Sequence, residues 1–285
     1  MQKFRWAVNI NDWIPNKNQW IKAMKCIQVE ERERIRKFRY RKDAKSSIVG
    51  RLLLRLWASL AFKIPSNQFE FTRTDRGRPK LKMKLALDQG WDFNVSHAGN
   101  FTVLVAQTSV DSIGVDVMGL NDKRFERSDE KIQEFFRIMN KQFTQSEWDQ
   151  IKSSQNPLAT FFRFWTLKES FIKAHGDGLA WDLQRLNFDV KSSDLFQPKK
   201  FRESVLSIDG NLAQNWIFEE TIIDSEHCIS TALKNSSDDS QVTPDFEVLH
   251  MEHVLDDLVE FNDPNGDNEH EWTHFLNQIE NKPFF

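Results

Sequence analysis

The strongest constraint on the fold is an apolar helical pattern that runs from residue 43 to residue 63. Within it, apolar residues recur at every fourth position, at Ile48, Leu52, Leu56 and Leu60. This spacing places them on one face of a helix, and Pro65 ends the pattern. A face this wide has to be buried, and alternating apolar residues predict strands to cover it, at 4–10, 69–71, 93–96 and 101–107.

The rest of the chain contains the same mixture of elements. A capping box from Thr144 to Glu147 opens one helix, and Asn156 with Pro157 opens another that continues to His175. Short apolar runs predict strands at 113–118, 186–190, 204–208, 216–221 and 228–233. Because the chain lacks a βαβ rhythm and a glycine-rich dinucleotide loop, we predict an α+β fold with mostly antiparallel strands.

Composition excludes several classes of protein. The chain is 39% apolar, with 24 Phe and 10 Trp, which excludes global disorder. Its two cysteines, Cys26 and Cys228, exclude a disulfide framework and a four-cysteine zinc site. The sequence has no apolar run of about 18 residues, and its first residues lack the apolar core of a signal peptide. We therefore expect a cytosolic protein without a membrane span.

Charge is distributed unevenly along the chain. The formal net charge is −3, but residues 1–84 carry +15 and residues 235–285 carry −12. A basic region of this size indicates an anionic partner, such as a nucleic acid, an anionic cofactor or an acidic protein. Solvated helix faces are the alternative explanation.

Charged residues on apolar elements mark where chemistry is expected. Glu169 and Lys173 are spaced by four on a largely apolar helix, so they share one face, while Lys168 points about 100° away. Asp116 lies inside an apolar strand, where an unpaired carboxylate costs several kcal/mol and requires a hydrogen-bonded partner or a metal ion. Two such carboxylates suit Mg²⁺. An ordinary surface ion pair and a solvent-facing edge-strand aspartate are the alternatives.

Two further segments are suited to anions. The segment 94–97 ends a strand with a serine and a histidine, which can donate hydrogen bonds to phosphate. Arg73, Arg76 and Arg78 surround Gly77 in a predicted turn, and guanidinium groups pair with phosphate through two parallel hydrogen bonds. A structural histidine and a solvated basic turn are the corresponding alternatives.

Taken in this order, the segments resemble the signatures of the 4′-phosphopantetheinyl transferase family, and within it the broad-specificity surfactin-type group and its animal relatives. The resemblance lies in residues 93–97, 114–118 and above all 164–174, where a Trp-x-x-Lys-Glu-Ser-x-x-Lys pattern matches the family signature in full. Supporting similarity lies in residues 30–35, 41–45 and 73–79. The resemblance extends over residues 4–234.

This resemblance implies two similar α/β subdomains that form a pseudo-dimer, with coenzyme A in the cleft between them. Residues 1–111 would form the N-terminal subdomain, which contacts the coenzyme A phosphates, and residues 112–234 the C-terminal subdomain, which holds the metal and the catalytic residues. Residues 235–285 are expected to be an acidic tail that is partly ordered at best. The implied post-translational reaction is Mg²⁺-dependent transfer of 4′-phosphopantetheine from coenzyme A to a serine of an apo acyl or peptidyl carrier domain, with release of adenosine 3′,5′-bisphosphate.

The resemblance also assigns roles to residues. Asp116 and Glu169 would bind Mg²⁺, Glu169 would take the proton of the serine hydroxyl, Lys173 would hold the pyrophosphate, and Lys168 would lie near the phosphates. The remaining coenzyme A contacts carried over from the family are Arg34, Arg73, Thr74, Asp75, Arg76, Gly77, Arg78, Asn94, Val95, Ser96 and His97. Met118 departs from many bacterial members, which have a glutamate there as a third metal ligand; we expect a water instead.

The partners implied are coenzyme A and an acidic carrier, which belongs to a fatty-acid synthase, to mitochondria or to an aminoadipate reductase of lysine metabolism. The sequence does not distinguish these carriers, and no nucleic acid or membrane is expected to bind. An internal pseudo-dimer makes a monomer sufficient.

Three alternatives are open at this point. His270, Glu271 and His274 match the H-E-x-x-H pattern of zinc peptidases, although residues 277 and 280 do not extend it to the longer form and the preceding segment is polar. A nucleic-acid-binding module would use the basic first third of the chain. An inactive relative of the family is the third alternative.

Overall fold

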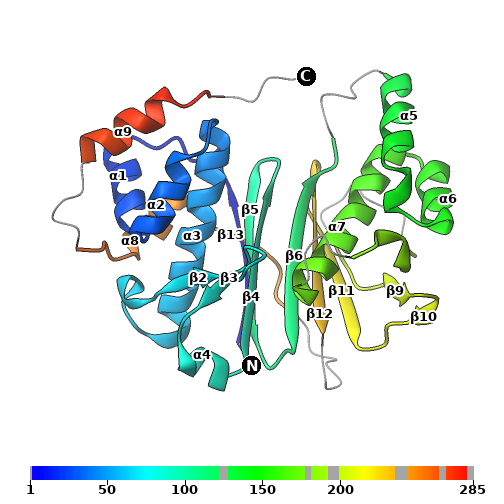
Figure 1. Cartoon of the computed structure of the whole chain (residues 1–285), viewed down its shortest axis with the longest axis horizontal. Helices are drawn as coiled ribbons and strands as arrows, with labels where there is room; N and C mark the ends of the chain where they lie inside the picture. The colour runs from blue at the N-terminus through cyan, green and yellow to red at the C-terminus, as the bar shows by residue number, and fades with distance from the viewer. Residues whose placement is uncertain are drawn as a thin grey trace.

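Two four-stranded sheets stand in the middle of the structure, and helices cover their outer sides (Figure 1). This computed structural model describes residues 2–121, 128–176, 181–191, 199–234, 243–262 and 268–280. The helices are α1 (Lys17–Lys25), α2 (Val29–Arg36), α3 (Arg41–Phe62), α4 (Lys84–Asp88), α5 (Asp129–Ile138), α6 (Gln145–Ser153), α7 (Pro157–His175), α8 (Met251–Asp256) and α9 (Asn268–Asn277). The strands are β1 (Lys3–Asn9), β2 (Phe71–Arg73), β3 (Pro79–Leu81), β4 (Trp91–Ala98), β5 (Phe101–Thr108), β6 (Ser112–Gly119), β7 (Leu186–Asp189), β8 (Lys199–Phe201), β9 (Val205–Ile208), β10 (Asn211–Leu212), β11 (Trp216–Asp224), β12 (His227–Lys234) and β13 (Glu247–Val248).

Each half of the chain supplies most of one sheet and one long helix that packs on it, and the C-terminal segment adds β13 to the N-terminal sheet. The N-terminal sheet has the order β13-β1-β5-β4 and is covered by α3, while the C-terminal sheet has the order β6-β12-β11-β8 and is covered by α7. All pairings are antiparallel except that of β1 with β13. The predicted α+β fold is therefore confirmed, and the arrangement is compatible with two similar halves.

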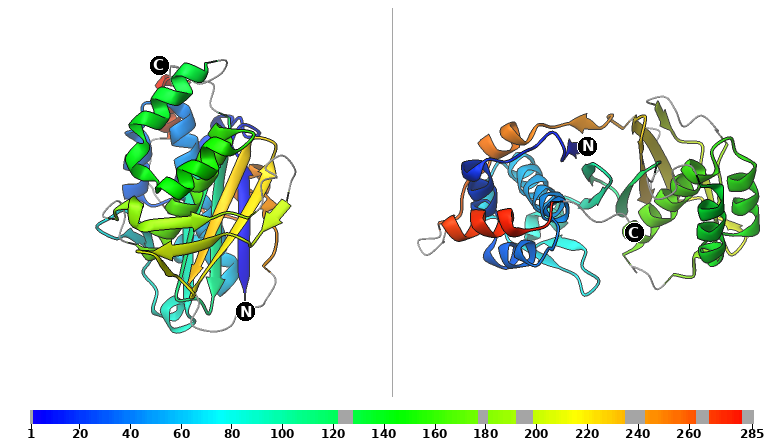
Figure 2. Two further views of the ribbon diagram at one scale, coloured as in Figure 1. Left: turned by 90° about the vertical axis from the view of Figure 1, so that its right-hand side faces the viewer. Right: turned by 90° about the horizontal axis from the view of Figure 1, so that it is seen from above.

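The apolar core forms three clusters, one beneath each helical layer and one between the sheets. The alternation of side chains along the strands explains this division, because successive residues point to opposite faces of a sheet. In β5, Leu104 packs on the helices of the N-terminal half, whereas Val103 and Val105 pack between the sheets. There they meet Val115 and Val117 of β6. The two sheets thus lie face to face (Figure 2), and burial of the aliphatic side chains between them holds them together.

Helix ends follow the predicted caps. Asn156 caps α7 by accepting a hydrogen bond from the backbone of Ala159, and Thr144 caps α6 in a reciprocal capping box with Glu147. The backbone of Gly176 is left-handed and closes α7. The long helix that carries the proposed catalytic residues therefore begins and ends where its sequence dictates.

The C-terminal segment differs from the expectation of a peripheral tail. Strand β13 pairs with β1, and α8 and α9 lie against the N-terminal helices (Figure 2). Met251, Val254 and Leu255 are buried in the N-terminal core, and the ring of Phe275 stacks on Trp20 with 3.9 Å between centroids. Only a few apolar residues of this acidic segment make the contacts with the core. The overall composition of the segment therefore did not predict that it packs there. Residues 235–242 of the segment lie outside the described residues.

Opposite charges accompany this packing. Acidic residues of the C-terminal segment pair with basic residues of α1 and α2, in the pairs Lys17–Glu269, Lys22–Asp256, Lys25–Glu260 and Arg36–Glu271. Most of these pairs are exposed and contribute little to stability individually. Part of the basic charge of the first third of the chain is therefore matched by the chain itself, and an external anion is not needed to explain that part.

The H-E-x-x-H pattern lies on α9. Glu271 is buried and forms an ion pair with Arg36, so it is not available as a catalytic base. Within the described ranges, no group of three or more His, Cys, Asp or Glu side chains is arranged to hold a metal ion. None of the described helices is long and apolar enough to cross a membrane.

We predict that Leu255→Ala destabilises the protein by about 2–5 kcal/mol, because it removes a buried side chain from the N-terminal core and leaves a cavity. Chemical denaturation followed by tryptophan fluorescence measures this. Glu252→Ala, on the exposed side of the same helix, is the matched control. Equal stability of the Leu255 variant and the wild type would show that the C-terminal segment is peripheral after all.

Candidate active site

One cavity of about 780 Å³ opens between the two halves of the chain. Its N-terminal wall comes from α2, α3, the turn between β2 and β3, and β4, and its C-terminal wall from α7. Of the predicted site residues, those that line it are Arg34, Arg73, Arg76, Gly77, Arg78, Asn94, Val95, His97, Glu169 and Lys173. Residues far apart in the sequence are thus brought to one space, as the predicted site requires.

Lys173 lines this cavity and forms a hydrogen-bonded group with Asp116 and Ser96, which are buried beside it and are not among the lining residues. The ammonium of Lys173 lies 2.6 Å from Asp116 Oδ1 and 2.6 Å from Ser96 Oγ, and Ser96 Oγ donates to the same Oδ1 at 2.8 Å. The other carboxylate oxygen, Asp116 Oδ2, is buried and has no hydrogen-bonding partner in the structure. A buried carboxylate oxygen without a partner is unfavourable, so the group is suited to a further cation.

Glu169 lies one helical turn before Lys173 and lines the cavity. Burial raises the pKa of Glu169, the negative charge of Asp116 raises it further, and Lys173 opposes both effects. The two carboxylates therefore repel each other while one lysine lies beside them. Oxygen donors of this kind fit a hard divalent cation such as Mg²⁺, which binds through one or two carboxylates together with phosphates and water.

Gly114 sets how closely α7 approaches the strand that carries Asp116. A Cβ atom at this position would overlap with the backbone of Ser170 and Ala174 in α7. The absence of a side chain lets the helix lie directly on β6. This contact brings Glu169 and Lys173 within reach of Asp116, which is two residues further along the strand.

Strand β4 is joined to β6 by side chains in place of a backbone ladder. Asp92 Oδ2 accepts from the backbone N–H of Ile113 at 2.7 Å, and Asn94 Oδ1 accepts from that of Val115 at 3.2 Å. Ser96 continues this row with its hydrogen bond to Asp116. Asn94 thus has a structural role in the cavity wall in addition to any contact with a ligand.

The arginine turn contributes unequally to the cavity. Arg78 is held by Asp92, with distances of 2.7 and 2.8 Å, and also donates to carbonyl oxygens of both halves, so its side chain ties them together. Arg73 donates to the carbonyl oxygen of Gly77, whose φ of +86° favours glycine. Thr74 and Asp75 are exposed and are not among the residues that line the cavity.

Lys168 requires a correction. Its side chain is completely buried, forms an ion pair with Glu147 at 2.7 Å, and donates to the carbonyl oxygens of Gln142, Leu183 and Leu186. A buried ammonium needs such partners, and they lie on the side of α7 away from the cavity. The structure therefore places Lys168 away from the cavity, where it connects α7 to its neighbours. The sequence predicted that the Lys168 side chain points about 100° away from Glu169, but it did not identify the residues that Lys168 contacts.

Sequence reasoning missed several cavity residues on α2 and α3, namely Lys37, Ser46, Ser47, Gly50 and Arg51. Arg51 is the notable one, because an arginine within an apolar helical pattern was the available signal. Burial lowers the pKa of Arg51 to about 10, with Arg73 and Arg34 adding to the effect. Burial lowers the pKa of His97, and the positive charge of Lys173 lowers it further.

An α+β fold with a cavity lined by Glu169, Lys173 and several arginines, and with Asp116 bonded to that lysine, is suited to an enzyme that acts on a phosphorylated substrate. Two family models match the chain: "4′-phosphopantetheinyl transferase, N-terminal" over residues 11–109 and the 4′-phosphopantetheinyl transferase superfamily over residues 112–232. The chain belongs to the 4′-phosphopantetheinyl transferase family. It is a transferase that uses coenzyme A as the donor of the phosphopantetheine group.

Curated relatives agree with this assignment along most of the chain. The chain is similar to L-aminoadipate-semialdehyde dehydrogenase-phosphopantetheinyl transferases from three vertebrates. It is 39% identical to the mouse protein (82% of this chain, 75% of the relative) and 36% identical to the human protein (91% and 87%). It is 34% identical to the protein from Xenopus laevis (98% and 94%). The predicted resemblance is confirmed.

We predict that Gly114→Ala lowers stability by about 3 kcal/mol or more and abolishes transfer, because the added methyl group pushes α7 away from Asp116. Gly119→Ala on the same strand is the control, since the nearest atom to its Cβ is 3.8 Å away. Thermal unfolding and turnover measure both effects. Normal activity of the Gly114 variant would contradict the close packing described above.

Glu169→Gln is expected to raise the melting temperature of the metal-free protein at pH 8 but not at pH 4. Because the folded-state pKa of Glu169 is raised, its neutral form stabilises the fold at low pH, and that contribution is lost as pH rises through the raised value. The glutamine resembles the neutral form at every pH. Glu134→Gln is the control with opposite sign, because Arg137 lowers the pKa of Glu134. A variant no more stable than wild type at pH 8 would contradict the raised pKa.

Proposed function

We propose that the cavity binds coenzyme A and that Asp116 and Glu169 hold a Mg²⁺ ion beside its diphosphate. The observation that carries this is the buried Oδ2 of Asp116, which lacks a partner, together with the repulsion between the two carboxylates. The ion would offset negative charge on the diphosphate oxygens as the bond to the leaving group breaks. The chain itself offers two carboxylates for this purpose, so water and phosphate oxygens would complete the coordination, with a water at the Met118 position.

In the proposed reaction, the hydroxyl oxygen of a carrier serine attacks the phosphorus next to the pantetheine. A new P–O bond forms, the P–O bond of the diphosphate breaks, and adenosine 3′,5′-bisphosphate leaves. Glu169, directly or through a water, accepts the proton of the serine. Lys173 faces the same space and would hold the diphosphate. Its hydrogen bonds to Asp116 and Ser96 keep its ammonium in place before the substrate arrives.

The basic wall of the cavity would hold the remaining phosphate and nucleotide groups. Arg34, Arg73, Arg76 and His97 line it and would contact coenzyme A, as predicted. Asn94, Val95, Gly77 and Arg78 shape the wall. For Arg78 the proposal rests on position alone, since its donors already hold the two halves together.

For the acceptor, we propose carrier domains, with that of an aminoadipate-semialdehyde dehydrogenase as the first candidate because the mouse, human and Xenopus relatives carry this name. The serine would enter from the open side of the cavity near Glu169. Since both walls come from one chain, a monomer is sufficient. The cytosol is the expected compartment.

We expect the protein, with coenzyme A and Mg²⁺, to add one phosphopantetheine group to an apo carrier domain. Intact-mass spectrometry with a panel of apo carriers measures this and ranks the acceptors. Glu169→Gln should lose transfer by a factor of about 10² or more, since a positioned base contributes that much, while coenzyme A still binds.

Two outcomes would contradict the proposal. No adduct on any carrier would refute the activity of this chain, and full turnover of Glu169→Gln would remove Glu169 as the base. Mg²⁺ should also raise the melting temperature of the wild type and do so less for Asp116→Asn, which tests the metal site without reference to activity.

A further inference from the structure

Arg51 of α3 lines the cavity, and not all of the N–H donors of its guanidinium group are used within the protein. Its side chain lines the cavity, yet the residue is only 8% exposed. Nη1 donates to the backbone and the hydroxyl oxygen of Ser47, at 2.7 and 2.6 Å. Nε is buried without a hydrogen bond, and Nη2 has no partner among the residues that the structure describes. Because Nε lies beside Glu31 and Nη1 is bonded to Ser47, Nη2 is the donor left for an anionic ligand in the cavity.

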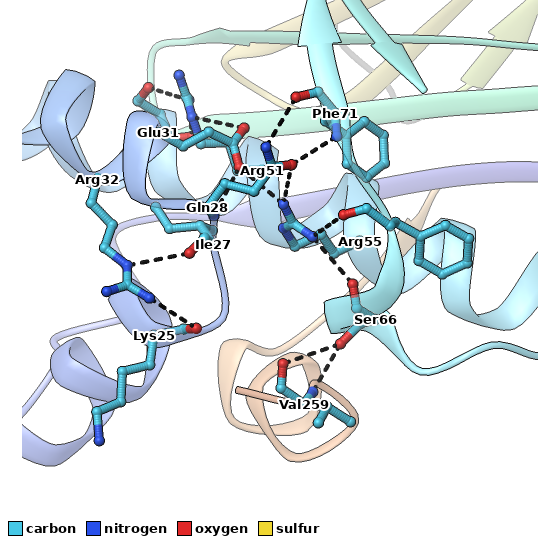
Figure 3. Close-up of polar contacts among 12 residues, drawn as sticks. Lys25, Ile27, Gln28, Glu31, Arg32, Arg51, Arg55, Ser66, Phe71 and Val259 are labelled. Atoms are coloured by element: carbon cyan, nitrogen blue, oxygen red, sulfur yellow. Dashed lines mark hydrogen bonds and ion pairs between the residues drawn. The ribbon is translucent and has the colours of Figure 1, made fainter. Parts of the chain in front are cut away.

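Glu31 forms an ion pair with this arginine (Figure 3). Its carboxylate lies between two guanidinium groups, with Oε1 3.4 Å from Arg51 Nε and Oε2 3.2 Å from Arg55 Nη2. Glu31 is itself held, because the backbone N–H of Gln28 donates to it in the capping box of α2. The oxygen of the Gln28 side chain accepts from Arg55 at 2.7 Å. Glu31 therefore has little freedom to move, and neither has the side of Arg51 that faces it.

The charges around this group do not cancel. Arg34 and Arg73 line the same cavity as Arg51, and the positive charge of each lowers the pKa of Arg51. Glu31 raises that pKa, but it does not line the cavity. Glu31 also shares its charge with Arg55 on its other side. The wall keeps an excess of positive charge that a phosphate group can offset.

We propose that Arg51 donates a hydrogen bond to a phosphate oxygen of coenzyme A and that Glu31 is the positioning residue that orients Arg51 for this contact. The proposal rests on the proposed function of the cavity. Arg51 binds through donors that the protein leaves unused, and Glu31 contacts no ligand. The ion pairs of Glu31 with Arg51 and Arg55 keep the guanidinium of Arg51 at the cavity wall before coenzyme A enters, which lowers the entropy lost on binding.

Isothermal titration calorimetry with coenzyme A tests both the binding role of Arg51 and the positioning role of Glu31. Arg51→Met should weaken binding by about 10- to 100-fold, the range expected for a charged hydrogen bond, and Arg51→Lys should weaken it less. Arg39→Met is the matched control, because Arg39 is exposed and is not among the residues that line the cavity.

Glu31→Gln separates positioning from simple charge. The substitution makes the cavity more positive, so electrostatics alone would tighten coenzyme A binding, whereas loss of positioning should weaken it about fivefold. Glu33→Gln makes the same charge change on the exposed side of α2 and should not weaken binding. Melting temperatures identify any variant that fails to fold, and Arg51→Lys then carries the test of Arg51.

The possible results are distinguishable. A wild-type protein that binds no coenzyme A refutes the proposed function. Wild-type binding with unchanged affinity in Arg51→Met overturns the role of Arg51, and equal or tighter binding in Glu31→Gln overturns the positioning role. A repeat with dephospho-coenzyme A then assigns the contact. If Arg51→Met weakens the binding of dephospho-coenzyme A as much as that of coenzyme A, Arg51 contacts the diphosphate. If dephospho-coenzyme A binds the variant and the wild type equally well, Arg51 contacts the 3′-phosphate.

Discussion

The row of side chains that joins β4 to β6 determines the geometry of the site. Asp92, Asn94 and Ser96 alternate along β4, so they point to one side, and each makes a hydrogen bond to β6. Their polar groups are largely shielded from water between two halves that otherwise meet through aliphatic side chains. Unpaired, each would be costly, which fixes the register between the halves. Asp116 on one half and Ser96 on the other thus lie where Lys173 can bind both.

A second consequence of this junction concerns charge. Asp116 and Glu169 belong to the C-terminal half, whereas the arginines of the cavity belong to the N-terminal half. A ligand with several phosphate groups would therefore meet carboxylates and guanidinium groups that are supplied by different parts of the chain. The acidic C-terminal segment pairs with basic residues on the outer helices, such as Arg36.

Local signals in the sequence were sufficient for most elements and for the central residues of the site. The caps at Thr144 and Asn156 predicted where α6 and α7 begin, and Asp116, Glu169 and Lys173 stood out as charges on apolar elements. Environments that depend on distant segments were not predictable. Lys168 has the same kind of signal as Lys173, but its partners come from three other segments, and Arg51 faces a cavity that exists only once α2, α3 and the arginine turn meet.

The packing of the C-terminal segment bears on the order in which the protein forms during synthesis. Strand β13 pairs with the first strand of the chain, and buried residues of α8 and α9 complete the core of the N-terminal half. Domains usually fold one after another as they emerge from the ribosome. Here the core of the N-terminal half is complete only after β13, α8 and α9 have been translated. This core therefore stays incomplete while the C-terminal half is synthesised.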